Sequence, residues 1–119
     1  MQKIEAIIKP FKLDEVKDAL SEMGVEEMTI TLVRGFGRQK GHTEIPRFLK
    51  GEIAFVSKLK VEAVVTNDLV NQACSTILKA ARTGSIGDGK IFVSAITKAV
   101  GICNGETDER SVSGFKLVN

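Results

Sequence analysis

Hydrophobic and polar residues alternate along two short segments that resemble one another, at residues 3–8 and 60–65. The first reads Lys-Ile-Glu-Ala-Ile-Ile and the second Lys-Val-Glu-Ala-Val-Val, so Lys, Glu and Ala are identical and the other positions exchange β-branched residues. Alternation with a period of two predicts strands with one apolar face. The residues on these apolar faces are Ile4, Ala6, Ile8, Val61, Ala63 and Val65.

Each of these strands is followed by apolar residues at helical spacing. The first helical pattern runs from Leu13 to Met23, with Gly24 placed to end it, and the second runs from Leu69 to Ala81. Further strands are expected at 28–33 and 90–94, which are rich in β-branched and aromatic residues. The order βαβ, connection, βαβ predicts one α+β domain over residues 1–119. Its expected fold is a ferredoxin-like split βαβ sandwich (βαββαβ), in which two helices cover one face of the sheet.

The opposite face of the two repeated strands mixes charged and apolar residues. Two interpretations are open for this face. It is either exposed to solvent, which composition alone favours, or it is an oligomer interface in which charges pair across subunits. The residues of this mixed face are Lys3, Glu5, Ile7, Lys60, Glu62 and Val64.

Composition narrows the class of protein. Hydrophobic residues make up 43% and charged residues 27%, as in ordinary globular domains. The net charge of +2 and the absence of Tyr and Trp argue against a nucleic-acid partner. The sequence shows neither the apolar run of a signal peptide nor an apolar stretch of 18 residues, so a cytoplasmic protein is expected. Cys74 lies within the second helical pattern and is interpreted as a small core residue rather than a reactive thiol.

Two glycine-containing segments are candidates for function. The connection at residues 35–57 is long, glycine-punctuated and basic, yet retains apolar residues, which is typical of a mobile loop that docks on a partner. At residues 83–90, three glycines and Lys90 could bind an anion through backbone N–H groups, although a purely structural turn explains them equally well. This segment is not a P-loop, because Ile91 replaces the Mg²⁺-binding Ser or Thr and the order is helix, loop, strand.

The sequence contains no set of residues spaced as a catalytic group would require. His42 is the only histidine, and no Ser, Cys or carboxylate is spaced to act as its partner. The number of His and Cys residues is too small for a structural metal site. We therefore expect a protein that is not an enzyme.

Three stretches, at residues 3–13, 35–44 and 79–93, together resemble the PII signal-transduction family, and the similarity extends over residues 1–107. The resemblance implies a ferredoxin-like homotrimer with nucleotide sites between subunits, which makes the mixed sheet face an interface. In family terms, residues 35–57 resemble the T-loop, residues 83–90 the B-loop and residues 101–106 the C-loop.

The resemblance also implies roles for individual residues. Those expected to contact nucleotide phosphates are Gly37, Arg38, Gly87, Gly89 and Lys90. Those expected near the adenine are Thr29, Glu62 and Val64. Gln39 is expected to help hold a Mg²⁺ ion chelated by 2-oxoglutarate, and Lys58 to pair with the distal carboxylate of that ligand.

The chain departs from the family pattern at several positions. Gly101 and Cys103 stand where the family carries two phosphate-binding arginines. Hydrogen bonds to charged groups contribute roughly 1.5–3 kcal/mol each, so their loss weakens ATP binding by about 10²–10⁴. Gly51 and Leu49 occupy the positions of the uridylylated tyrosine and the phosphorylated serine, so no covalent modification is expected.

Three functions follow from the resemblance and these departures. The first is a PII-type sensor in nitrogen regulation, which binds an adenine nucleotide, with or without 2-oxoglutarate, and regulates a target enzyme or membrane transporter through its T-loop. The second is a divergent sensor that has lost tight ATP binding and reads AMP, ADP or bicarbonate for another pathway. The third, which the residues favour least, is a small enzyme on the same fold.

Overall fold

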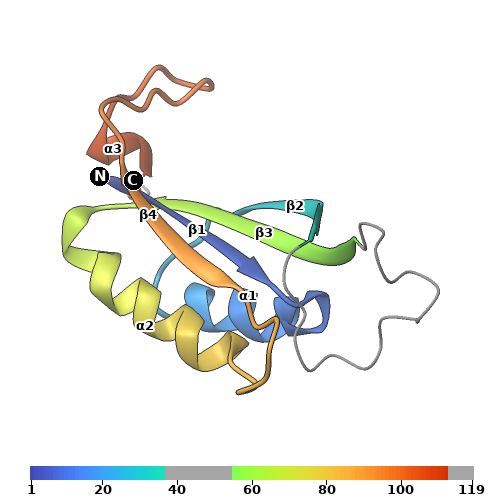
Figure 1. The fold of residues 1–119 in the computed structure, drawn as a ribbon. Coiled ribbons are helices and arrows are strands. Elements are labelled where there is room, and N and C mark those ends of the chain that lie inside the picture. The colour runs from blue at the N-terminus through green and yellow to red at the C-terminus, as the bar shows by residue number, and fades with distance from the viewer. Residues whose placement is uncertain (37–54, 113–119) are drawn as a thin grey trace.

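The computed structural model describes residues 1–36 and 55–112 and forms a four-stranded sheet with two helices against one face (Figure 1). The first half contains β1 (Gln2–Ile8), a 3₁₀ turn (Pro10–Lys12), α1 (Leu13–Glu22) and β2 (Thr29–Gly35). The second half contains β3 (Val56–Val65), a 3₁₀ turn (Asn67–Leu69), α2 (Val70–Ala81) and β4 (Lys90–Ala95). A short helix, α3 (Glu109–Val112), follows the second half.

The sheet is antiparallel throughout and has the strand order β2-β3-β1-β4. The two repeated strands, β1 and β3, lie side by side at its centre, with Ile4 opposite Ala63. Helices α1 and α2 pack against each other, and α2 also contacts β1. This arrangement confirms the predicted α+β, ferredoxin-like split βαβ fold.

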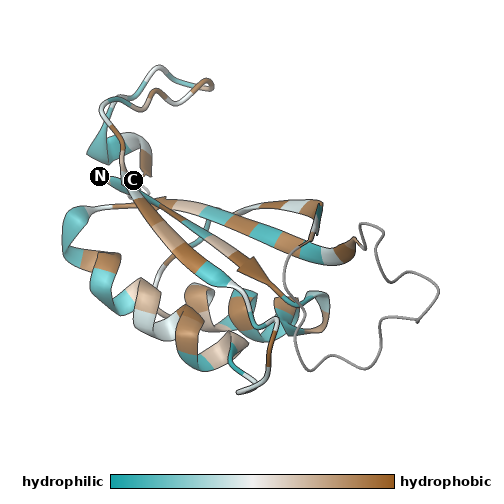
Figure 2. Cartoon of the chain, viewed as in Figure 1, coloured by the Kyte–Doolittle hydropathy of each residue, from teal (hydrophilic) through white to brown (hydrophobic). Residues whose placement is uncertain are grey.

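The core lies between the helices and the apolar faces of β1 and β3. Ile4, Ala6 and Ile8 are each exposed by 2% or less, and the predicted face of β3 is buried with them. Polar and apolar residues alternate along β3 from Lys58 to Ala63 (Figure 2). Cys74 packs against this core but is only partly buried. The period-two alternation therefore identified the core face correctly, because alternate side chains of a strand point to opposite faces.

The limits of the central connection differ from those expected. The β2–β3 ladder continues to the pair Gly35 and Val56, so Gly35 and residues 56–57 belong to strands rather than to a loop. Phe36 and Phe55 extend this pairing with an edge-to-face contact between rings 5.6 Å apart. Cross-strand pairing therefore overrides the glycine signal at this end of the loop. The rest of the predicted T-loop, with Gly37, Arg38, Gln39, His42, Leu49 and Gly51, lies outside the described residues.

Candidate ligand-binding site

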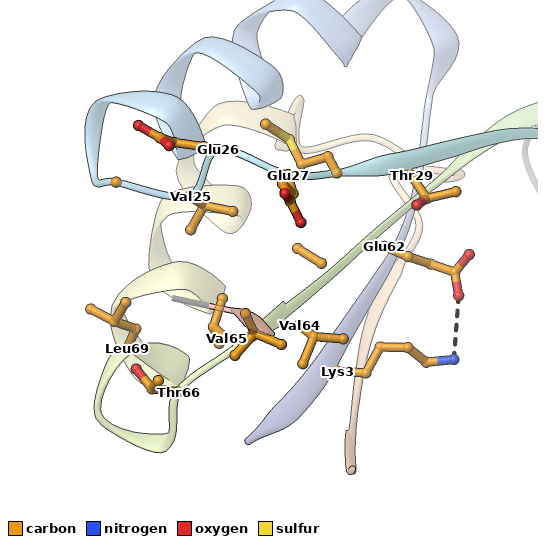
Figure 3. Close-up of a pocket in the computed structure, with 14 residues that line it drawn as sticks. Lys3, Val25, Glu26, Glu27, Thr29, Glu62, Val64, Val65, Thr66 and Leu69 are labelled. Carbon is orange, nitrogen blue, oxygen red and sulfur yellow. Dashed lines mark ion pairs between the residues drawn. The ribbon is translucent and has the colours of Figure 1, made fainter. Parts of the chain in front are cut away.

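A cavity of about 610 Å³ lies where β2 and the end of β3 meet the connection that follows α1 (Figure 3). Its walls include the three residues expected near an adenine, Thr29, Glu62 and Val64. The sheet geometry explains why they meet. Thr29 stands directly opposite Glu62 in the β2–β3 register, and Val64 shares the Glu62 face because it lies two residues further along the strand. The first group of predicted site residues is thus brought together.

The cavity has the size of a small-molecule site. Its volume falls within the usual range for ligand pockets, and its walls combine apolar residues with the charged side chains of Lys3, Glu26, Glu27 and Glu62. Val64, Val65 and Leu69 supply apolar surface. The Thr29 hydroxyl can donate or accept a hydrogen bond, whereas the Glu62 carboxylate accepts only. This set fits a purine, which has apolar faces and polar edges.

The segment at residues 83–90 folds around the carboxylate of Asp88. The backbone N–H groups of Thr83 and Gly84 donate to Asp88 Oδ2 at 2.9 and 2.8 Å, and the Thr83 hydroxyl donates to Oδ1. Lys9 Nζ lies 3.2 Å from the same Oδ1. The Thr83 hydroxyl is the main cause that holds the pKa of Asp88 well below its usual range. Asp88 therefore sets the shape of this loop.

Asp88 and Lys9 lie within the stretches that resemble the PII family, but the sequence pattern gave neither residue a role of its own. One signal could have identified the aspartate. Asp side chains commonly accept hydrogen bonds from nearby backbone N–H groups in turns, and Asp88 follows a Thr83-Gly84 pair. The contact with Lys9 has no such signal, since Lys9 comes from the other half of the chain.

Close packing explains one of the glycines in this loop. Gly89 has a φ of +102°, and a Cβ there would lie 2.8 Å from the carbonyl carbon of Ile7 and closer still to its oxygen. Gly87 also has a positive φ, of +93°. The structural interpretation therefore accounts for Gly89 by itself, and the contribution of these glycines and Lys90 to phosphate binding stays a prediction.

Lys58 lies against the same loop. Its ammonium donates a hydrogen bond to the carbonyl oxygen of Gly87. Burial is the main cause that lowers the pKa of Lys58, and the nearby charge of Lys9 lowers it further, whereas Asp88 acts in the opposite direction. The structure thus brings the predicted 2-oxoglutarate residue Lys58 next to Gly87.

In the described part of one chain, the residues predicted to contact phosphates and those predicted to lie near the adenine do not line the same cavity. Gly89 and Lys90 line a smaller cavity of about 270 Å³ between α2 and the ends of β1 and β4. Along β1, Lys3 stands opposite Val64 and Ile7 opposite Lys90. Four residues of strand separate these positions, which corresponds to about 13 Å. The predicted residues therefore fall into two separate groups, which are candidate half-sites.

The predicted C-loop at residues 101–106 is a compact turn. The N–H of Gly101 donates to the Glu106 carbonyl at 2.7 Å, and the N–H of Gly105 donates to the Gly101 carbonyl at 2.8 Å. Asp108 closes the turn through its backbone and side chain, which both bond to Ala99. Cys103 is exposed. Neither Gly101 nor Cys103 supplies the cation that the family pattern has there.

Within residues 1–36 and 55–112, no three His, Cys, Asp or Glu side chains are grouped so that they could hold a metal ion. In the same part of the chain, no helix has the length and apolar character needed to cross a membrane.

Comparison with known proteins agrees with this architecture. A family model described as nitrogen regulatory protein P-II matches residues 1–106. The nitrogen regulatory protein P-II of Klebsiella oxytoca is 52% identical over 112 residues, which cover 94% of this chain and all of that protein. The protein of the same name from Haemophilus influenzae is 53% identical with the same coverage.

A solved structure is similar as well. The Arabidopsis thaliana PII protein bound to citrate superimposes with a TM-score of 0.77 at 38% identity, covering 92% of this chain and 90% of that one. The sequence relatives are named as regulatory proteins, which confirms the expectation of a regulator rather than an enzyme.

Proposed function

Because the chain belongs to the nitrogen regulatory protein P-II family, we propose that it is a cytoplasmic sensor that binds an adenine nucleotide and regulates a target protein. One observation carries this proposal. Thr29, Glu62 and Val64, which come from two strands, line one cavity large enough for a purine nucleoside. The target is an enzyme or membrane transporter that docks on the T-loop, the connection between Gly35 at the end of β2 and Val56 at the start of β3.

The two half-sites support a homotrimer. In one chain the adenine cavity and the loop at residues 83–90 are separate, so a neighbouring subunit would complete each nucleotide site. The mixed sheet face suits a subunit interface, because its lysines and glutamates pair with one another and Phe92 is 54% exposed beside them. Light scattering should give about three times the monomer mass of 12.9 kDa. A stable monomer at micromolar concentration would contradict this assembly.

The phosphates would lie at the loop formed by residues 83–90. Lys90 would supply a cation there, together with backbone N–H groups of Gly87 and Gly89, and Gly37 and Arg38 would complete the set from the T-loop. With 2-oxoglutarate present, Gln39 would help to hold the chelated Mg²⁺ ion. Lys58, beside Gly87, would then pair with the distal carboxylate of that ligand.

A second candidate function rests on the turn at residues 101–106. Since Gly101 and Cys103 offer no cation to the outer phosphates, ATP should bind weakly and AMP or ADP comparatively well. The protein would then be a divergent sensor of AMP, ADP or bicarbonate that regulates a different target.

Calorimetry tests both candidates. We expect ADP to bind the purified protein. Lys90→Gln should weaken the affinity for ADP by about tenfold or more, because it removes a charged hydrogen bond. Lys12→Gln is the matched control, because among the described residues Lys12 has one ion pair, with Glu15 at 3.3 Å, and otherwise lies over the ring of its neighbour Phe11. Separate titrations with ATP, AMP, bicarbonate, and 2-oxoglutarate with Mg²⁺ distinguish the two sensors. Failure of every adenine nucleotide to bind below millimolar concentration would refute the first function.

A further inference from the structure

Four charged side chains form an alternating row across β1 and β3, and two of them line the large cavity. Lys3 Nζ lies 3.3 Å from Glu62 Oε2 and 3.9 Å from Glu5 Oε1. Lys60 Nζ lies 3.8 Å from the other carboxylate oxygen of Glu5. The row is therefore Glu62, Lys3, Glu5, Lys60, and its first pair is marked by the dashed line in Figure 3. Both Lys3 and Glu62 line the cavity.

The two glutamates depend on the lysines to different degrees. Glu5 stands directly opposite Glu62 in the β1–β3 register, which places two like charges side by side. Glu5 has two lysine partners, whereas Lys3 is the only cation within ion-pair distance of Glu62 in the part of the chain that is described. Removal of Lys3 would leave Glu62 with Glu5 opposite it and no cation to hold it.

We propose that Lys3 is a positioning residue that fixes the Glu62 carboxylate in the cavity, so that the site selects a purine with a 6-amino group over one with a 6-oxo group. This inference rests on the proposed nucleotide binding. A carboxylate only accepts hydrogen bonds. The 6-amino group of adenine is a donor, whereas the 6-oxo group of guanine or hypoxanthine at the same position is an acceptor. A fixed Glu62 attracts the first and repels the second, and a carboxylate free to turn away distinguishes them poorly.

The test compares the affinities of ADP and inosine diphosphate, which carry identical phosphates, so that contacts with the phosphate loop cancel in the ratio. The unmodified protein should prefer ADP by about tenfold or more, as expected for a hydrogen bond to a charged group. Lys3→Met should bring the ratio close to one. Lys60→Met is the matched control, since it removes the same charge from the same row but leaves the Lys3–Glu62 pair intact. It should retain the preference, and Lys3→Arg should restore it.

A merely structural role for Lys3 would weaken both ligands equally and leave the ratio unchanged, which would overturn the inference. Glu62→Gln should lower the ratio by itself, and adding Lys3→Met to it should change the ratio no further. If Lys3→Met does not assemble, the exchanged pair Lys3→Glu with Glu62→Lys keeps the net charge and presents a donor to the base. That variant should prefer inosine diphosphate, and a retained preference for ADP would refute the inference. Absence of binding by both ligands to the unmodified protein would instead refute the proposed function.

Discussion

Gly89→Ala should destabilise the protein far more than Gly84→Ala, although both glycines have positive φ. Gly84 has a φ of +85° with nothing within 4 Å of an added Cβ, so its substitution costs only the left-handed backbone, about 1–2 kcal/mol. Gly89 has a φ of +102°, and its added Cβ would overlap the Ile7 carbonyl. Overlap with rigid backbone adds about 1–3 kcal/mol, since β1 or β4 must shift. We therefore expect a total loss of about 2–5 kcal/mol at Gly89.

Urea unfolding at one subunit concentration measures this difference, because the stability of an oligomer depends on concentration. The Gly89→Ala substitution should also disturb the candidate ligand site, because the next residue, Lys90, is the first residue of β4 and pairs with Ile7. ADP binding should therefore weaken in Gly89→Ala and change little in Gly84→Ala. Equal losses of stability in the two variants would show that the contact with Ile7 is not what demands glycine.

Three further predictions concern the loops and the cysteines. The double variant Gly101→Arg with Cys103→Arg should raise the affinity for ATP by about 10² or more and the affinity for AMP by less, because only the longer polyphosphate reaches both new charges. Calorimetry measures both affinities. Low-micromolar ATP binding by the unmodified protein, far tighter than its AMP binding, would contradict this. The hydrogen bond from Thr83 and its neighbours lowers the folded-state pKa of Asp88, so its stabilisation is present above the ordinary aspartate value of about 3.9 and is lost as pH falls below it. In Asp88→Asn, the free energy of unfolding measured in urea should fall less between about pH 5 and pH 2 than in the unmodified protein. An equal fall in both proteins would contradict the assignment. A thiol reagent at neutral pH should label exposed Cys103 faster than Cys74, whose pKa is raised by burial, and mass spectrometry of each peptide checks the order.

Local pattern was sufficient for the central architecture. Alternation in β1 and β3 identified their buried faces, and three- and four-residue spacing located α1 and α2 to within a residue or two at each end. These features depend on which side chains leave water within a single element, and that is encoded in the period of the sequence. Pattern failed at Gly35 and Val56, where strand pairing extends through a segment that looks like a loop.

The candidate site was only partly accessible to the same reasoning. Glu62 and Val64 were assigned to one face from alternation and to the adenine from family resemblance. The sequence left the mixed face open to exposure or to charge pairing between subunits, and the structure shows that Lys3 and Lys60 pair with Glu62 and Glu5 within one chain. Composition could count those charges, but only the strand register shows which of them come within reach.

The sequence by itself determined the elements, the core face, the glycine-rich loop and the substitution of both C-loop arginines. Only the tertiary structure decided which distant residues meet. It placed Thr29 opposite Glu62 and brought Lys9 to Asp88. The reason is physical, since period and composition act within an element, whereas register and packing join residues far apart in the chain. The close approach of the Ile7 carbonyl to position 89, which adds to the positive φ in requiring glycine there, likewise exists only in the tertiary structure.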